Sequence, residues 1–326
     1  MKKTLSNIIT TYIVITFFLL TNITNSSIES QVLVYNLDAP AIDPQLNAMI
    51  QDMNWLKWTT INSSLEENNL EDITHLILYN HRHDRTYTQT ELDAIKNWYN
   101  VGGKTIWVSS DSDFFTNNGR ITSANQILTE IDSSLRAESA SVRDPVHNAY
   151  PNFRLLAVPE TNEDTIDIVE GVERVLVSGP SSIIGYVNEE FVALEESNIE
   201  NILVVLVSQE TSELVDNTGV PPEAHSVGTG SFVVLAVEID PVRKNIVIVG
   251  GESVFASGEG MYKPELLYPS KYTEDYPQQG SLLVENLLRY SIEKEWPEET
   301  GINIPLNLYT ILLGIGVFFA VLQREK

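Results

Sequence analysis

Two short polar stretches contain the residues whose types and spacing could do chemistry. One is the His81-Arg-His83-Asp84 segment, and the other is 109–113, which reads Ser-Ser-Asp-Ser-Asp. Alternate residues of an extended segment point the same way, so His81 and His83 could bind one metal ion together. Their spacing fits no standard zinc pattern, and we favour the alternative of a hydrated polar loop.

Both stretches directly follow apolar runs that read as buried strands, at 74–79 and 104–109. Open α/β sheets bind ligands at the carboxyl ends of their strands, so we expect these side chains to line one crevice. Such a crevice could hold a glycan or a metal ion. Its candidate residues share a position at or just after a strand end: Asn36, Asp38, His81, His83, Asp84, Ser110, Asp111 and Asp113.

Ser110 is the only candidate nucleophile among these residues, and its surroundings argue against catalysis. A serine nucleophile needs a histidine base and benefits from a G-x-S-x-G turn, and neither is evident around 109–113. We therefore expect a protein without enzymatic activity or cofactor, with a hydrolase using Ser110 as the remaining alternative. We also expect Ser110, Asp111 and Asp113 to tolerate replacement, because they read as loop residues.

Apolar periodicity predicts the elements that must position these residues. Short β-branched runs predict strands at 31–37, 57–61, 74–79 and 104–109. Between them, Asp43-Pro44 marks the start of one helix, and the Thr88 and Glu91 capping box marks the start of a second helix that ends at Gly102-Gly103. A third helix is expected to open at Ser123.

The second half of the chain is less regular. We expect strands at 166–169, 174–177 and 202–208, then a hairpin formed by 231–238 and 245–249, and a last helix over 281–292. The strand pairing within 138–230 cannot be read from the sequence. Early strand–helix alternation followed by strands predicts a mostly parallel, flavodoxin-like α/β sheet with added strands or a small second lobe.

Four stretches together resemble the class I glutamine-amidotransferase-like domain in its non-catalytic GIFT variety. They are QVLVYNLD at 31–38, THLILYNHRHD at 74–84, YTQTELDAIKNWYNVGGKTIWVSSDSDF at 87–114 and GSFVVLAVEIDPVRKNIVIVGGESVF at 230–255. Active members of that family carry a cysteine nucleophile on the turn that corresponds to 109–113 here, whereas this chain has no cysteine. The resemblance therefore implies a non-catalytic scaffold.

GIFT domains occur in intraflagellar-transport proteins, in ABC-transporter accessory proteins and in a non-catalytic subunit of oligosaccharyltransferase. The oligosaccharyltransferase subunit is similar in plan, and the segment PEAHSVG at 222–228 resembles the corresponding part of it. That subunit has a further β-rich domain before its anchor, where this chain has only a short stem. The resemblance implies an accessory subunit of a membrane complex, with integral membrane proteins as partners.

The two ends predict where the protein resides. Residues 1–27 have the basic start, short apolar centre and small polar end of a signal peptide, an uncleaved anchor being the alternative. Residues 304–322 form an uncharged run long enough to span a bilayer, followed by a tail at 323–326 that carries two basic residues. A buried core helix is the alternative for that run. We expect a type I single-pass protein, at the cell surface or in an endomembrane.

The predicted layout places an extracytoplasmic domain at 28–294 and a stem at 295–303, with Asn62 as its glycosylation candidate. The chain has 326 residues and a net charge of −25. Such an acidic chain without a basic stretch does not bind nucleic acid by neutralising phosphates, so no nucleic-acid partner is expected.

Overall fold

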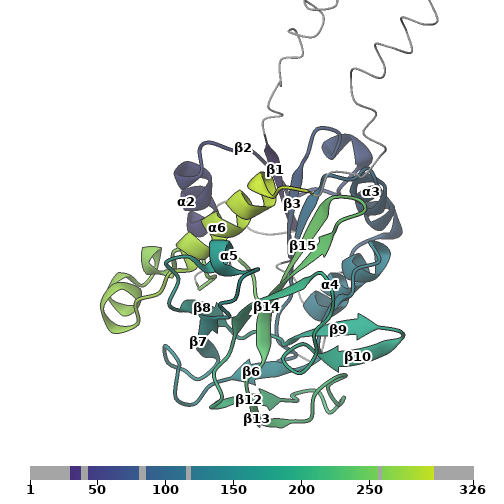
Figure 1. Cartoon of the computed structure of the whole chain (residues 1–326). Coiled ribbons are helices and arrows are strands. Elements are labelled where there is room, and N and C mark those ends of the chain that lie inside the picture. The colour runs from purple at the N-terminus through teal and green to yellow at the C-terminus, as the bar shows by residue number, and fades with distance from the viewer. Residues whose placement is uncertain (1–29, 38–42, 81–85, 115–118, 256–258, 297–326) are drawn as a thin grey trace, which may run out of the picture. The chain divides into compact units, whose positions relative to one another are not determined.

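The computed structural model describes residues 30–37, 43–80, 86–114, 119–255 and 259–296. Within these ranges the central element is a nine-stranded sheet with the order β2-β1-β3-β4-β15-β14-β11-β7-β8 (Figure 1). Its first five strands are parallel, and the candidate residues lie in or follow three of them, β1, β3 and β4, in the sequence. The five parallel strands are β2 (Lys57–Ile61), β1 (Gln31–Leu37), β3 (His75–Asn80), β4 (Thr105–Ser109) and β15 (Asn245–Gly250).

The remaining four strands extend the same sheet in antiparallel fashion. They are β14 (Val233–Asp240), β11 (Ile202–Val207), β7 (Arg154–Pro159) and β8 (Val175–Ser178). The prediction of a parallel sheet with added strands is thus confirmed, and the β14–β15 hairpin forms as expected. The order of the parallel half is that of flavodoxin-like sheets.

Five of the eight described strands within 138–230, whose pairing the sequence did not reveal, belong to two three-stranded antiparallel sheets. One has the order β10-β9-β5, with β10 (Glu190–Ala193), β9 (Ile183–Val187) and β5 (Leu135–Ala137). The other has the order β13-β12-β6, with β13 (Gly228–Gly230), β12 (Ser212–Val215) and β6 (Ser141–Arg143).

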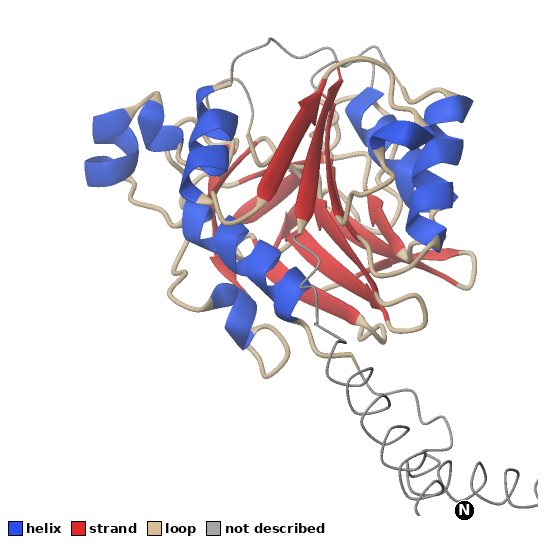
Figure 2. Ribbon diagram, turned by 90° about the horizontal axis from the view of Figure 1, so that it is seen from above, coloured by secondary structure: helices blue, strands red, loops and turns tan. Residues whose placement is uncertain are grey.

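Helices cover both faces of the central sheet, as Figure 2 shows from above. One face carries α3 (Gln89–Asn100) and α4 (Gly119–Glu130), and the other carries α2 (Pro44–Asp52), α5 (Ile166–Val169) and α6 (Gly280–Glu293). Short helical turns occur at Glu67–Asn69, Pro264–Leu266 and Lys271–Asp275. Because helices pack on both faces, the inner strands β4 and β15 are buried throughout and show no polar alternation, whereas the edge strand β2 is largely exposed.

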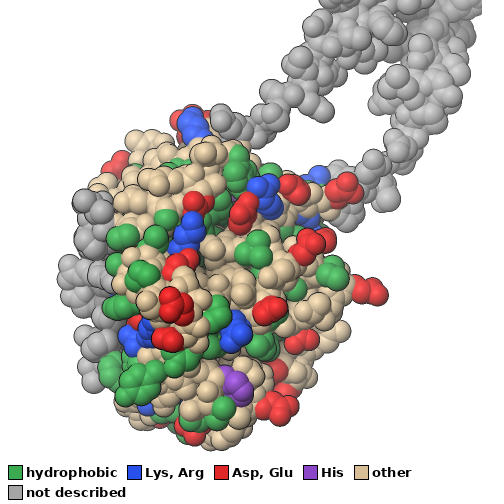
Figure 3. Space-filling model, turned by 90° about the vertical axis from the view of Figure 1, so that its left-hand side faces the viewer, with side chains coloured by type: hydrophobic (Ala, Val, Ile, Leu, Met, Phe, Trp, Pro, Cys, Tyr) green, Lys and Arg blue, Asp and Glu red, His purple; other side chains and the backbone are tan. Residues whose placement is uncertain are grey.

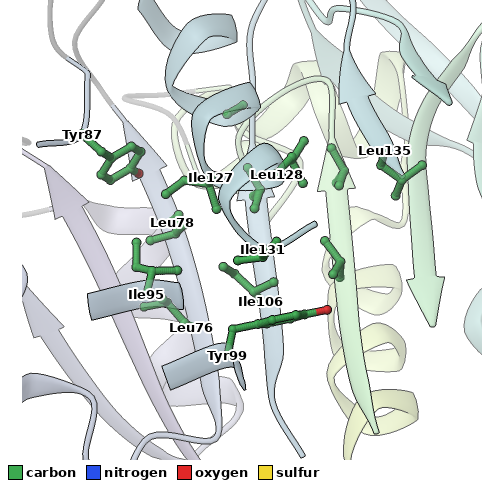
Figure 4. Packing of buried hydrophobic residues seen from close by; sticks show 14 of the residues in the cluster. Leu76, Leu78, Tyr87, Ile95, Tyr99, Ile106, Ile127, Leu128, Ile131 and Leu135 are labelled. Carbon is green, nitrogen blue, oxygen red and sulfur yellow. The ribbon is translucent and has the colours of Figure 1, made fainter. Parts of the chain in front are cut away.

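The core beneath α3 and α4 shows why these two helices form where they do. Ile95 and Tyr99 of α3 and Ile127 of α4 pack against Leu76 of β3 and Ile106 of β4 (Figure 4). The capping box closes the first turn of α3, since Thr88 accepts from the Glu91 amide while Glu91 accepts from the Thr88 amide. Local signals and buried contacts therefore agree over this segment.

Two predicted elements differ in the structure. Residues 166–169, expected to be a strand, form α5, because the Asn162 side chain accepts hydrogen bonds from the amides of Asp164 and Thr165 and starts a helical turn. Helix α4 begins at Gly119, four residues before Ser123.

The folded unit ends at Glu293, and Lys294–Lys326 form a second unit, of which the structure describes residues 294–296. Across the described ranges, no helix is both long enough and apolar enough to cross a bilayer. The predicted signal peptide at 1–27 and the predicted span at 304–322 lie outside these ranges.

Candidate functional site

The carboxyl edge of the parallel strands brings the turn after β4 beside the turn after β15. Ser109 of β4 pairs with Gly250 of β15, so the turns that follow these two strands begin side by side. Asp111 and Glu252 each lie two residues beyond that pair. Asn36 lies in β1 in register with Tyr79 of β3. Four predicted candidates lie outside the described residues: Asp38, His81, His83 and Asp84.

Ser110 is held inside the turn rather than presented on it. The residue is 3% exposed, its amide donates to the Gly250 carbonyl at 2.8 Å, and its hydroxyl lies 3.5 Å from the Asp111 carbonyl. The three histidines within the described ranges bond to other groups: His75 to Thr74 and Ser291, His147 to Thr211, and His225 to Glu138.

Asp111 and Glu252 form a buried acidic pair, and the Arg120 guanidinium acts on both. Arg120, from the first turn of α4, donates to Asp111, and the Ser112 amide donates to Asp111 Oδ1 at 2.7 Å. Burial raises the pKa of Asp111 although Arg120 opposes it. Burial and the neighbouring Asp111 charge raise the pKa of Glu252 well above its usual range. Burial and Asp111 therefore both favour the protonated form of Glu252, and Arg120 balances the Asp111 carboxylate.

Asp113 is fully buried and stabilises the turn. It accepts hydrogen bonds from the Ser141 hydroxyl at 2.7 Å and from the Asn217 amide nitrogen at 2.8 Å, with a further bond from the Asn217 side chain. The prediction that Asp111 and Asp113 tolerate replacement assumed that they are solvated loop residues, and that assumption is wrong. These residues do not lie in a solvated loop, and removing a buried, bonded carboxylate leaves its partners unsatisfied.

The segment that precedes β9 completes the packing of this edge. The Ser112 amide donates to the Gly179 carbonyl at 3.1 Å, and the Ser181 amide donates to the Gly251 carbonyl at 3.0 Å. A Cβ atom on Gly251 would lie 2.1 Å from the Ser181 carbonyl oxygen, so only glycine permits this approach. The turns after β4 and β15 are thus fixed by backbone contacts.

A pocket of about 310 Å³ opens beside these turns. Its walls come from the turn after β4, from β6, from the end of β8 with Gly179, and from the loop before β7. Polar and aromatic side chains share the lining: Asp111, Ser112, Phe114, Ser141, Arg143, Asn152, Phe153 and Ser178. Its size lies at the lower end of the range of small-molecule sites.

A second charged cluster lies at His225, within the 222–228 segment singled out by the sequence. Its Nδ1 bonds Glu138 Oε2 at 2.6 Å, and its Nε2 lies 3.3 Å from Glu195 Oε1. The fully buried Glu138 also accepts from the amides of Ala224 and His225. Burial lowers the pKa of His225, but Glu138 and Glu195 outweigh burial and raise it to about 9. These hydrogen bonds hold the 222–228 segment against Glu138, which directly follows β5.

Sequence reasoning missed Arg120, Glu252 and Glu138. Glu252 could have been predicted, because it follows an apolar strand in the same way as Asp111 does. The sequence assigned β15 to a hairpin but did not place it beside the parallel strands. Arg120 lies in a helical turn that the sequence did not predict. Nothing in the sequence marks Glu138, whose partners lie 86 and 87 residues away.

Two further predictions concern metal binding and glycosylation. Among the described residues, no group of three or more histidine, aspartate or glutamate side chains is placed to hold a metal ion. The predicted histidine ligands lie outside those residues. Asn62 is exposed directly after β2, which leaves it accessible as a glycosylation site, and its modification stays a prediction.

No family model matches the sequence, and no curated protein matches it. Solved structures do match. The chain is similar to the "mmIFT52 N-terminal domain" with a TM-score of 0.54 and 11% identity, over 82% of this chain and 100% of that one. It also matches a putative GMP synthase component from Thermoplasma acidophilum with a TM-score of 0.39 and 10% identity, over 82% and 98% of the two chains. The first likeness shows that the chain shares the fold of the mmIFT52 N-terminal domain.

Proposed function

We propose that the chain is a non-enzymatic, membrane-anchored accessory subunit whose GIFT-type domain acts as a scaffold in a membrane complex. The main support for the proposal is that the turn after β4 is buried and its aspartate is ion-paired. The residue in the place of an amidotransferase nucleophile, Ser110, is 3% exposed, and the adjoining Asp111 is ion-paired with Arg120. A nucleophile must reach its substrate and a base, and this turn supports neither.

The shared fold with the mmIFT52 N-terminal domain also supports the non-catalytic branch, because the sequence resemblance includes intraflagellar-transport proteins. The buried Asp111–Arg120–Glu252 network is typical of a structural element, since its charges are balanced internally. The complex itself would be related to oligosaccharyltransferase or to an ABC transporter, as the resemblance implies. A glycan- or metal-binding surface domain and a hydrolase using Ser110 are the alternatives.

Co-purification from detergent-solubilised membranes tests the scaffold directly. We expect the full chain to be recovered with a stoichiometric integral membrane partner, and the Ser110→Ala variant to recover the same partner in the same ratio. Recovery of the chain alone from both preparations would contradict the proposal.

Hydrolysis assays on the same two preparations test the enzymatic alternative. We expect glutamine and ester hydrolysis at background in the wild type, because Ser110 has no histidine base among the described residues. The Ser110→Ala chain should match it in thermal stability within about 1.5 kcal/mol, because the change removes a buried hydroxyl whose contact with the Asp111 carbonyl is long. A rate above background that disappears in Ser110→Ala would establish the hydrolase instead.

A further inference from the structure

The pocket beside the turn after β4 has two aromatic walls that solvent reaches. Phe114 is 63% exposed and Phe153 is 39% exposed, although both carry large apolar rings. The buried Val142 also lines the pocket. An engineered apolar cavity of about 150 Å³ is enough to bind benzene, so a pocket of about 310 Å³ accommodates a ring with a substituent.

The same pocket contains one positive charge without a carboxylate partner. The Arg143 guanidinium donates to the Asn217 side-chain oxygen at 2.7 Å, and among the described residues no carboxylate lies within ion-pair distance of it. The acidic group on the wall, Asp111, is already paired with Arg120. Arg136 and Arg174 also have no ion-paired carboxylate among the described residues, so what distinguishes Arg143 is its place on the pocket wall.

Neutral hydrogen-bonding groups complete the lining around Arg143. The side chains of Ser112, Ser141 and Ser178 and of Asn152 lie on the walls. Arginine pairs well with planar carboxylates, and charge-assisted hydrogen bonds are about twice as strong as neutral ones. The negative field of the whole chain disfavours a dianion, so one guanidinium matches a singly charged ligand.

We propose that this pocket binds a monocarboxylate that carries an apolar or aromatic body, with Arg143 holding the carboxylate and the two phenylalanine rings holding the body. The inference goes beyond the scaffold function and does not depend on it, since it concerns a small ligand and not the membrane partner. Failure to find a partner would leave the pocket proposal intact, and failure of ligand binding would leave the scaffold proposal intact.

Ligand-observed NMR on the purified full chain tests the proposal with three probes. They are 3-phenylpropionate, its neutral amide 3-phenylpropanamide, and acetate, which has the charge but no ring. We expect saturable binding of 3-phenylpropionate, binding of the amide at least about tenfold weaker, and no measurable binding of acetate, because both the charge and the ring contribute. Equal binding of acid and amide, or no saturable binding of the acid, would overturn the proposal.

Two pocket variants and two matched controls localise the binding. Arg143→Gln removes the charge and keeps a donor for Asn217, and we expect it to weaken 3-phenylpropionate binding about tenfold or more. Phe114→Ala alters an exposed ring, so the chain should fold normally and bind several-fold more weakly. The controls are Arg174→Gln and Phe191→Ala, which lie outside the pocket and should bind like the wild type. An unchanged affinity in both pocket variants would refute the assigned site.

The same titration distinguishes two sources of an apolar carboxylate. N-acetylphenylalanine resembles the carboxyl end of a peptide, whereas 3-phenylpropionate resembles a free acid. Tighter binding of N-acetylphenylalanine assigns the pocket to a chain terminus, and weaker binding assigns it to a small metabolite. Either result supports a carboxylate site, provided that Arg143→Gln weakens both probes.

Discussion

At the scale of single residues, His225 makes stability depend on pH in the alkaline range. An ordinary histidine has a pKa near 6.5, whereas Glu138 and Glu195 outweigh burial and raise the pKa of His225 in the folded chain to about 9. The folded state therefore holds a proton that the unfolded state releases first. This contribution is fully present below a pH of about 6.5 and is lost as the pH rises through about 9.

We expect the wild-type free energy of unfolding to fall between pH 7 and pH 9, and His225→Gln to be less stable at pH 7 and flatter over that interval. The measurement is urea denaturation at half-unit pH steps. His147→Gln is the control, since its side chain is 40% exposed and bonds Thr211, and it should keep the wild-type slope. An alkaline decline of the same size in His225→Gln would show that other groups cause it.

The buried network around Asp111 and Asp113 shows what sequence reasoning at this scale could and could not do. It correctly placed Ser110, Asp111 and Asp113 at a strand end, because strand length and polarity are local properties. It took them for solvated residues, because their partners Arg120, Ser141 and Asn217 lie in segments without a readable pattern. Burial of a polar group depends on what packs against it, and no periodicity encodes that.

At the scale of elements, the end of α3 meets the β14–β15 hairpin at two glycines. Gly102 and Gly103 both have left-handed backbones, with φ of +85° and +65°. A Cβ on Gly102 would lie 2.6 Å from the Arg243 carbonyl oxygen, which accepts from the Gly103 amide at 2.9 Å, whereas a Cβ on Gly103 would meet nothing within 4 Å. The first glycine is needed for backbone conformation and for space, and the second for conformation alone.

We expect Gly103→Ala to destabilise the chain by about 1–2 kcal/mol through the left-handed conformation. Gly102→Ala should cost at least about 1 kcal/mol more, because the Arg243 carbonyl must also move. The difference in denaturation midpoint between the two variants measures the close approach directly. Equal losses of stability in the two variants would mean that the hairpin turn moves away from the added methyl group at no cost in free energy.

The reliability of element prediction followed the strength of local signals. The capping box and Gly102-Gly103 delimited α3, apolar runs gave β1, β3, β4 and the hairpin, and β-branched residues gave β2. The strand predicted at 166–169 was wrong, because β-branched residues there are outweighed by the Asn162 side chain. Pairing of β5, β6, β9 and β12 could not be predicted, because such short strands pair with partners distant in the sequence.

At the scale of the whole molecule, the ends of the folded unit lie together, away from the pocket. The Ser30 carbonyl accepts from the Lys57 amide at the start of β2, and Ser291 near the end of α6 bonds His75 at the start of β3. Both ends therefore lie at the amino edge of the parallel strands, while Asp111 and Glu252 lie at the carboxyl edge. The two edges are separated by the length of the strands.

The surface of this unit bears on whether it could attach to a membrane by itself. Acidic and basic side chains are interspersed on the face in Figure 3, with hydrophobic side chains between them. The chain as a whole carries a net charge of −25, which repels an anionic lipid surface. No helix among the described residues is long and apolar enough to span a bilayer, and the predicted attachment rests on 304–322.

We expect removal of residues 302–326 to release a soluble protein with its fold unchanged. The apolar side of α6, which includes Leu283, Leu287 and Leu288, is already buried within the folded unit that ends at Glu293. We therefore expect the folded unit not to depend on residues 302–326. Charges in any other candidate span would each cost about 2.5–3.5 kcal/mol at the centre of a bilayer. The measurement is a carbonate wash of membranes that carry the full or the truncated chain, with urea denaturation of the truncated chain as the control for folding. The single-anchor prediction would be wrong if the truncated, signal-cleaved chain still pelleted with the membranes.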